Sequence, residues 1–503
     1  MTALPRFGRL IRQGSSGLLS LSAALAPALA AAAPTSIEIW YDLHGASAAA
    51  FTEFVGRFNA SQEEVRIETV FKGTDPADAH TEGDASAALL KAWRARQPLP
   101  VLVQVGDDRG EAVLAAKGVV RSIDGALPAA TIKSMLPQAV ALANGARGET
   151  FGFPFEVAVP LFFYNRDAYR KAGLDADAPP ATWRDLQAQL LALRQPATGV
   201  RCGYTTSDQA WIHVENLGAW HGENIAVARP NGTSGPLTFN GLLHVRHMAL
   251  MMSWLKSQLF TYTGRGKDGD ARFASGECAT LSAASTALAR VSTDARFSWA
   301  VAPMPYHEEG MAKAVGSIAG GSALWLTAGR KPAEVEAAAR FLTWFASAPI
   351  AGEWHRRTGS LPLTAAAYQD TLASGYYDRV PGLGPAMRTL VDGEAAVRRV
   401  RAPLRMPNHE RVREVIDAQL EAVWNGSKPA KQGLDDAVRL GNLAMRDPRG
   451  ELRREAAPAR VPVRANRANR ADRADRADRA PARVSTTTAS SAGHPAGSAS
   501  ARG

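Results

Sequence analysis

Residues 160–186, PLFFYNRDAYRKAGLDADAPPATWRDL, decide the fold because four structural signals follow one another without a gap. The apolar run at 161–164 predicts a buried strand. A helical segment follows and ends at Gly173, a residue type that favours the left-handed conformation at the C-terminus of a helix. After two prolines, Thr182 is a typical N-cap for a second helix. Strand, helix, loop and helix in this order indicate an α/β fold.

The same alternation continues on both sides of this stretch. Strand patterns precede it at 37–41, 65–73 and 101–105, and others follow it at 203–206 and 278–283, with helical segments between them. Strands separated by helices predict largely parallel sheets, in which ligands bind at the carboxyl ends of the strands. Because 503 residues exceed what one core usually organises, we expect two α/β lobes with a ligand cleft between them.

Both ends of the chain differ from this folded region. Residues 1–33 have the plan of a cleaved signal peptide, with three arginines, an apolar run and a small-residue motif at 28–30. We therefore expect an exported protein located in the periplasm. Residues 451–503 repeat Ala-x-Arg and then become rich in Ser, Thr, Ala and Gly. This composition supplies too few apolar residues for a core, so we expect a disordered tail.

The formal net charge of +10 does not indicate a nucleic-acid-binding protein. The excess of basic residues falls within residues 1–12 and 446–503, whereas residues 13–445 carry equal numbers of basic and acidic residues. A nucleic-acid groove needs a basic surplus on the folded part of the chain. We therefore expect a small-molecule ligand and no nucleic acid.

Sequence motifs for catalysis, metals and cofactors are absent or poorly placed. GRGKDG at 264–269 satisfies GxGxxG, but it lacks the flanking strand and helix of a dinucleotide site, and we interpret it as a surface loop. His213, His244 and His247 lack a further ligand at metal-binding spacing, and a solvated helix face is the simpler interpretation. We therefore expect no cofactor, no metal and no enzymatic activity.

The chain has two cysteines, Cys202 and Cys278, both at the starts of predicted strands in one lobe. In an oxidising compartment such a pair can form a disulfide. If the two strands are neighbours, the Cα atoms should lie within about 7 Å of each other. The alternative is a pair of buried free thiols.

The opening stretch also resembles a segment of the solute-binding proteins of ABC importers in the maltose-binding superfamily, where YYNKD, KAGLD and PP-TW-DL patterns occur in the same order. Other segments are similar to the glycerol-3-phosphate-binding branch of that family: RCGYTT at 201–206, WIHVENLGAWHG at 211–222, AGGSALWL at 319–326 and VREVIDAQLEAVW at 412–424. The resemblance covers about residues 36–445. It implies a monomer that binds glycerol-3-phosphate or a related glycerophosphodiester and delivers it to permease subunits in the inner membrane.

The same resemblance implies how the chain is divided between the lobes and how they move. Each lobe would consist of two segments: 34–156 with 285–326 for lobe one, and 157–284 with 327–450 for lobe two. Three hinge crossings would lie near 156–159, 283–286 and 326–328. Because the ligand would contact both lobes only when they close, it would select the closed state.

The resemblance also places the ligand-binding residues. Arg413 matches the family's phosphate-binding arginine, Trp211 a pocket tryptophan, and Gly321 the second glycine of a GG pair. Asp107 takes the place of a pocket glutamate, and we expect Trp40 to face the same cleft. The remaining candidates stand where the family has other pocket residues: Asp75, Ala158, Ala284 with Ser285, and Ser360.

These replacements remove hydroxyl groups and rings and add carboxylates, which a phosphate dianion disfavours. The ligand therefore has two interpretations. If it is a phosphate ester, Arg413 should bind it directly. If it is a neutral polyol or oligosaccharide, Arg413 should be neutralised by Asp208 or another carboxylate of the cleft. Two other classes stay open: a periplasmic hydrolase of phosphodiesters or glycans, and a sensor or scaffold with this fold.

Overall fold

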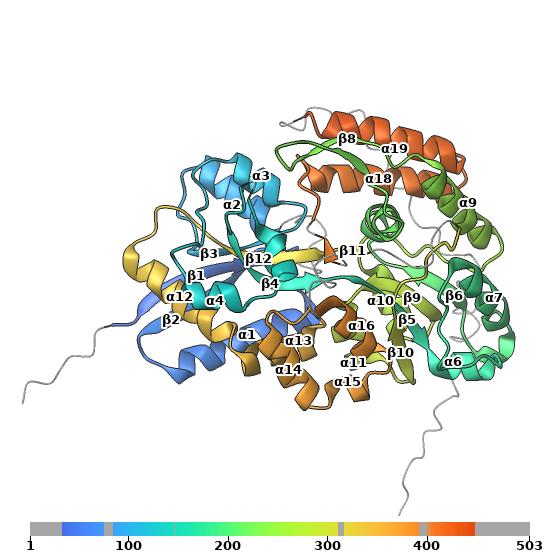
Figure 1. Cartoon of the computed structure of the whole chain (residues 1–503), viewed down its shortest axis with the longest axis horizontal. Coiled ribbons are helices and arrows are strands. Elements are labelled where there is room, and N and C mark those ends of the chain that lie inside the picture. Colours follow the sequence, from blue (N-terminus) through green and yellow to red (C-terminus); the bar gives the residue numbers. More distant parts are fainter. Residues whose placement is uncertain are drawn as a thin grey trace, which may run out of the picture.

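The computed structural model describes residues 33–74, 84–145, 147–309, 316–391, 400–401 and 403–447. They form two α/β lobes that lie side by side, as Figure 1 shows. The predicted signal peptide at 1–33, apart from Ala33, and the predicted tail at 451–503 lie outside these residues. Within the described segments, no helix has the length and apolar character that crossing a membrane requires.

Lobe one is built on a five-stranded sheet with the strand order β2-β1-β3-β12-β4. The strands are β1 (Thr35–Tyr41), β2 (Val65–Phe71), β3 (Leu102–Gly106), β4 (Gly152–Ala158) and β12 (Gly320–Leu326). β1 pairs in parallel with β2 and β3, whereas β12 runs antiparallel to β3 and β4. β1, β3 and β4 therefore end at the same edge of the sheet.

Helices pack on this sheet through their apolar faces. α1 (Gly45–Ser61) buries Phe51, Phe54, Val55 and Phe58, which recur at the helical repeat. α12 (Pro332–Phe345) packs against β1, and α13 (Ala348–Thr358) packs against α1. The other helices of this lobe are α2 (Ala85–Arg94), α3 (Gly110–Ala115), α4 (Ala129–Ser134), α5 (Pro137–Val140) and α14 (Ala365–Ala373).

Lobe two is built on a four-stranded sheet with the order β10-β5-β9-β6. Its strands are β5 (Pro160–Asn165), β6 (Cys202–Thr206), β9 (Cys278–Ala284) and β10 (Trp299–Ala302). Its helices are α6 (Arg166–Lys171), α7 (Trp183–Leu193), α8 (Leu217–Trp220), α9 (Leu242–Lys256), α10 (Asp268–Ala274), α18 (His409–Trp424) and α19 (Ala430–Ala444). α18 and α19 pack on each other and lie over the upper part of this lobe in Figure 1.

The opening stretch folds as its residue pattern predicts. β5 ends at Asn165, α6 follows, and Gly173 has the positive φ of +73° that favours glycine. Thr182 caps α7 reciprocally. Its hydroxyl accepts from the Asp185 N–H at 3.1 Å, and the Asp185 carboxylate accepts from the Thr182 N–H at 3.0 Å.

The structure differs from the predicted division of the chain in two places. β10 lies in the segment assigned to lobe one, but it pairs with β5 in the second sheet. α12 and α13 lie in the segment assigned to lobe two, but they pack on lobe one, because α12 buries Phe341 and Phe345 in that core. The predicted crossing at 326–328 is therefore not a crossing.

The other two predicted crossings correspond to real changes of direction. β4 ends at Ala158 in the first sheet, and β5 begins at Pro160 in the second. After β9, α11 (Ala287–Asp294) contacts α1 and α13 of lobe one before the chain returns to the second sheet in β10. The passage from β10 to β12, between the second and first sheets, takes the place of the crossing expected at 326–328.

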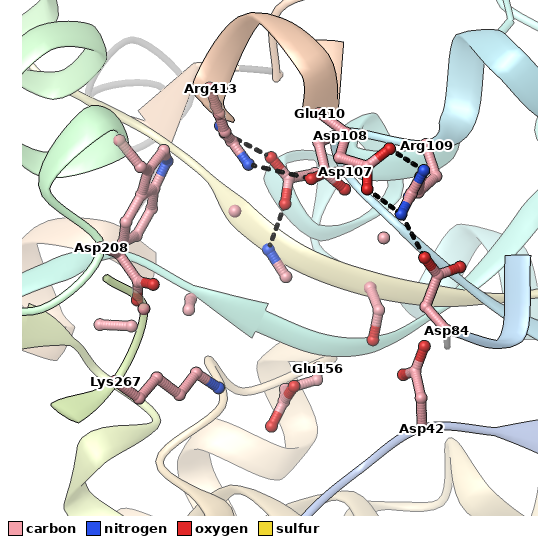
Figure 2. A pocket seen from close by; sticks show the side chains of 18 of the residues that line it. Asp42, Asp84, Asp107, Asp108, Arg109, Glu156, Asp208, Lys267, Glu410 and Arg413 are labelled. Carbon is pink, nitrogen blue, oxygen red and sulfur yellow. Dashed lines mark hydrogen bonds and ion pairs between the residues drawn. The ribbon is translucent and has the colours of Figure 1, made fainter. Parts of the chain in front are cut away.

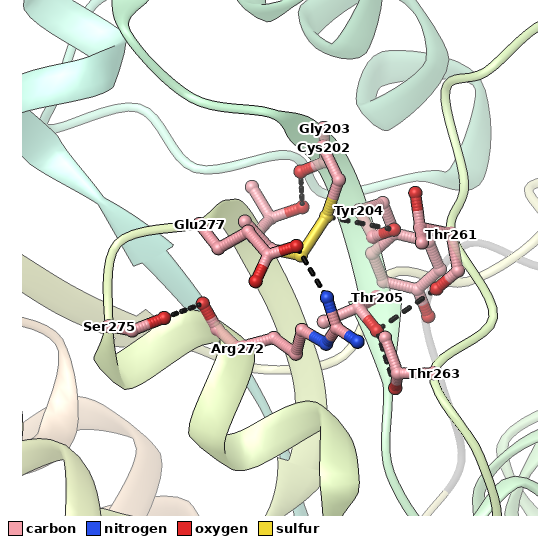
Figure 3. Close-up of a disulfide and its surroundings, with 11 residues drawn as sticks. Cys202, Gly203, Tyr204, Thr205, Thr261, Thr263, Arg272, Ser275 and Glu277 are labelled. Atoms are coloured by element: carbon pink, nitrogen blue, oxygen red, sulfur yellow. Dashed lines mark hydrogen bonds and ion pairs between the residues drawn. A yellow bond between two sulfur atoms is a disulfide. The ribbon is translucent and has the colours of Figure 1, made fainter. Parts of the chain in front are cut away.

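A disulfide joins the parallel strands β6 and β9 (Figure 3). Cys202 and Cys278 are direct register partners, and their Cα atoms lie 4.5 Å apart. Both side chains are buried. The bridge closes a loop of 76 residues within lobe two and therefore restricts the unfolded chain more than the folded one.

The histidines assigned to a solvated helix face are instead buried inside lobe two. His213, His244 and His247 are each at most 1% exposed. His213 Nδ1 lies 3.0 Å from His247 Nε2, and His247 Nδ1 lies 3.1 Å from His307 Nε2, so these rings form a hydrogen-bonded chain. His244 Nε2 donates separately to the Val214 carbonyl at 3.0 Å. The sequence pattern failed here because α9 is covered on this face by neighbouring elements of its own lobe.

We expect these histidines to make folding stability fall as the pH falls below about 6.5. Burial lowers the pKa of His213 to about 3, and those of His244 and His307 to about 4. The unfolded chain therefore takes up protons that the folded protein excludes. His244→Gln should reduce the slope of unfolding free energy against pH by roughly 1 kcal/mol per pH unit between pH 4.5 and 6. Urea unfolding at several pH values measures it, and an unchanged slope would contradict this assignment.

Candidate functional site

A polar cavity of about 480 Å³ lies where the two lobes meet (Figure 2). Lobe one contributes the carboxyl ends of β1, β3 and β4 and the beginning of β12. Lobe two contributes the segment after β6, the turn before α10 and one face of α18. The position follows from the topology, because strands that run in the same direction end at one edge of a sheet and leave their loops there.

Six of the ten residues predicted to bind the ligand line this cavity. They are Asp107, Ala158, Trp211, Ala284, Gly321 and Arg413. These residues come from β4, β9, β12, α18 and the segments that follow β3 and β6, so the fold brings together positions far apart in the sequence. The structure therefore places these six predicted positions around one cavity.

The other predicted residues do not line the cavity. Trp40 is buried, and the Lys72 ammonium lies over its ring, 4.1 Å from the ring centroid. The buried Ser360 hydroxyl accepts from the Val157 N–H at 2.9 Å, so it holds the end of β4. Ser285 is fully buried, and its backbone N–H donates to Val159 at 2.8 Å. Asp75 lies outside the described residues.

Arg413 is held by carboxylates of the protein. Its Nε and Nη2 donate to the two oxygens of Glu215 at 2.7 and 2.8 Å, and Nη2 also donates to Asp107 at 2.8 Å. Glu215 is 1% exposed and lies 2.8 Å from His409 Nε2 as well. Burial favours the neutral acid, but the charges of Arg413 and His409 outweigh it and hold the pKa of Glu215 far below its ordinary value.

Asp107 is fixed from a second side by the backbone of β12. Its carboxylate accepts from the Gly321 N–H at 3.1 Å, and its own N–H donates to the Gly321 carbonyl at 2.8 Å. Gly321 has a φ of +113°, and a Cβ there would lie 1.8 Å from the Glu156 carbonyl oxygen. A side chain at this position would therefore break the pairing of β12 with β4, which explains the glycine.

Ion pairs connect the two lobes around the cavity. Arg413 of α18 contacts Asp107 of lobe one. Arg109 of lobe one contacts Glu410 of α18 and Asp84 of its own lobe. Both arginines of the cavity are therefore held by carboxylates, as Figure 2 shows.

Lys267 is the cation of the cavity that has no ion pair within the described residues. It lies in GRGKDG, so this motif is not a remote surface loop but forms part of the cavity wall. Figure 2 shows its ammonium pointing across the cavity toward Glu156. The Glu156 charge raises the pKa of Lys267, although the two groups form no ion pair. Lys267 is solvent-exposed within this cavity.

Carboxylates outnumber cations in the cavity wall. Of the described residues that line it, nine are Asp or Glu and three are Lys or Arg. Burial, with the charges of Asp84 and Glu156, raises the pKa of Asp42 to about 6. Burial also raises the pKa of Asp417 to about 7, and its buried Oδ1 has no hydrogen-bond partner. The site therefore disfavours a ligand that carries only negative charge.

The sequence interpretation missed most of these carboxylates and Lys267. Asp42 and Asp84 follow or precede regular elements of lobe one, and Glu156 lies within β4. Glu215 lies within WIHVENLGAWHG, a segment that the sequence analysis used only for the resemblance. The position of Asp42 could have predicted its place in the cavity. A charged residue directly after a buried parallel strand lies at the ligand-binding edge of the sheet.

Two α/β lobes that meet at a polar cavity built from strand ends and helix faces define a solute-binding protein of the periplasmic type. The chain belongs to the bacterial extracellular solute-binding proteins, whose family model matches residues 76–376. Members of such importer systems bind small molecules and deliver them to permeases, and they act outside the cytoplasmic membrane. The family consists of binding proteins, so this protein is a binding protein and not an enzyme.

Two relatives and two solved structures describe this similarity. The sn-glycerol-3-phosphate-binding periplasmic protein UgpB of Yersinia enterocolitica is 34% identical over 447 residues, which cover 87% of this chain and 98% of the relative. The protein of the same name from Salmonella typhimurium is 33% identical over 435 residues, covering 85% and 96%. UgpB of Mycobacterium tuberculosis in complex with glycerophosphocholine has a TM-score of 0.67 at 19% identity, covering 82% and 98%. Maltose-bound MalE3 of T. maritima has a TM-score of 0.65 at 16% identity, covering 81% and 99%.

Proposed function

We propose that this protein is the monomeric periplasmic component of an ABC importer, and that it captures a glycerophosphodiester and delivers it to permease subunits in the inner membrane. The named relatives support a glycerophosphate ligand. The observation that carries the proposal is Lys267, a cation without an ion pair among the described residues, which faces the interlobe cavity. A phosphate oxygen is the natural partner for such a group.

The charge of the cavity favours a diester over glycerol-3-phosphate itself. A phosphomonoester carries nearly two negative charges at neutral pH, whereas a phosphodiester carries one. Arg413 and Arg109 are already held by carboxylates, so Lys267 would have to offset the ligand charge against several acidic neighbours. One negative charge meets less repulsion there than two.

Ligand capture would use the buried indole of Trp211 together with Lys267. Trp211 is 6% exposed, and its Nε1–H has no hydrogen-bond partner. A buried donor without an acceptor destabilises the protein, and a ligand oxygen in the cavity would satisfy it. Both groups belong to lobe two, so a ligand bound to them would stabilise closure of the lobes through its further contacts with the lobe-one residues of the cavity.

A neutral polyol or oligosaccharide is the second candidate, because Arg413 is neutralised by Glu215 and Asp107 within the protein. We expect isothermal titration at pH 7.5 to detect glycerophosphodiesters with several head groups more readily than glycerol-3-phosphate. Maltotriose serves as the neutral comparison. Binding of maltotriose alone would support the second candidate, and the absence of heat with every phosphate compound would refute the proposed function.

A further inference from the structure

Two carboxylates of the cavity, Asp42 and Glu156, belong to lobe one, and Lys267 of lobe two faces Glu156 across the cavity. In Figure 2, Asp42 and Glu156 point into the cavity on the side away from Arg413. Neither belongs to a salt bridge with a described residue, in contrast to Asp84 and Asp107, which contact Arg109 and Arg413. Among the described residues, the Asp42 carboxylate accepts a hydrogen bond from the Ala85 N–H alone, at 2.9 Å, and the Glu156 carboxylate accepts none.

An acidic group of this kind does not by itself make a ligand site, but two further atoms, on the lobe-two side of the same cavity, point to a ligand. The Trp211 Nε1–H is buried without an acceptor, in a side chain that is 94% buried. The Asp417 Oδ1 is buried without a donor. An unused donor and an unused acceptor in one cavity require a partner that supplies both an acceptor and a donor.

We propose that the cavity selects a zwitterionic glycerophosphodiester whose head group carries a primary ammonium. This inference rests on the proposed function and names its substrate class. The phosphate lies toward Lys267, and the ammonium lies between Asp42 and Glu156. The ligand then has no net charge, and each of its charges meets the opposite sign in the cavity.

The chemistry of the wall favours a primary over a quaternary ammonium. A primary ammonium has three N–H donors, which carboxylates accept directly. A quaternary ammonium has none and is recognised mainly by the faces of aromatic rings. Among the described residues that line the cavity, Trp211 is the sole aromatic side chain. Asp42 and Glu156 thus act as specificity-determining residues for the head group.

Titration of the whole protein with three phosphodiesters tests this inference. The ligands are glycerophosphoethanolamine, glycerophosphocholine and glycerophosphoglycerol, which share the glycerophosphate and differ in the head group. We expect the ethanolamine compound to bind at least about tenfold more tightly than the glycerol compound, a difference of about 1.4 kcal/mol. It should also bind more tightly than the choline compound.

Two variants test whether the carboxylates of Asp42 and Glu156 cause the preference for the ammonium. Glu156→Gln preserves the shape of the side chain and breaks no hydrogen bond of the described structure, so it should fold and lose most of the preference for the ammonium. Asp42→Asn retains an oxygen for the Ala85 N–H and should act in the same direction. Glu63→Gln, at an exposed position away from the cavity, is the matched control and should keep the preference.

The outcomes separate this inference from the proposed function. Equal binding of all three diesters would overturn the ammonium site and leave the proposed function intact. Tighter binding of the choline compound would overturn it too, as would a preference that survives in both variants. Binding of none of the three compounds would overturn the proposed function and the inference together.

Discussion

Glu215→Gln is expected to lower the free energy of unfolding by roughly 3–5 kcal/mol, the usual effect of removing one partner of a buried ion pair. The substitution keeps the volume of the side chain but removes the charge that holds Arg413 and His409. The guanidinium would remain surrounded by protein, hydrogen-bonded to Asp107 and 4.0 Å from Asp108. Urea unfolding at pH 7.5 with the disulfide intact measures the loss.

Glu277→Gln is the matched control for this prediction. Glu277 also pairs with an arginine, Arg272 at 2.5 Å, but about a third or more of each side chain is exposed. Solvent screens such pairs, and their removal usually changes stability by less than about 1 kcal/mol. Equal effects of the two substitutions would show that Glu215 does not neutralise a buried guanidinium.

The contacts of Arg413 indicate a structural role, whereas the family resemblance implied a phosphate-binding role. The resemblance identified it as a phosphate-binding residue, with neutralisation by a cleft carboxylate as the alternative. Its guanidinium meets both oxygens of Glu215 and one of Asp107, so carboxylates of the protein neutralise it in this structure. Asp208, the neutralising residue considered from the sequence, makes no ion pair with Arg413 among the described contacts.

Local features of the fold could be predicted because nearby residues determine them. The cap of α7 depends on Thr182 and Asp185, three residues apart, and the end of α6 depends on Gly173. The parallel neighbours β6 and β9 also carry a visible marker, since both begin with cysteine. Such signals require no knowledge of which distant segments pack together.

The division into lobes and the charge balance of the site could not be predicted in the same way. β10 joins the second sheet through pairing with β5, more than a hundred residues earlier in the chain. Glu215 meets Arg413 across 198 residues. Periodicity and capping carry no information about such contacts, and the family match assigned Arg413 without its partner. The sequence analysis did not consider Lys267 as a ligand-binding residue, because it compared GRGKDG only with a dinucleotide-binding motif.

Lys267→Gln should weaken binding of a glycerophosphodiester by about 30-fold to several thousand-fold, which corresponds to about 2–5 kcal/mol for truncating one partner of a charge pair that becomes desolvated. The loss should be large because the two arginines of the cavity are already engaged by carboxylates. Removal of Lys267 would leave the ligand phosphate facing Glu156 and Asp208 without a free cation among the described residues. Titration of both proteins with glycerophosphoethanolamine measures the change.

The stability of the variant distinguishes this role from a structural one. Lys267 forms no ion pair with a described residue and is exposed in the cleft, so Lys267→Gln should change the unfolding free energy by less than about 1 kcal/mol, the usual range for solvent-screened charges. Lys256→Gln, at the exposed end of α9, serves as the control and should alter neither property. A folded Lys267→Gln protein that binds the diester as tightly as wild type would show that phosphate is held elsewhere. Arg413 would then have to release Asp107 on binding, because it is the lobe-two cation that remains among the described residues lining the cavity once Lys267 is replaced.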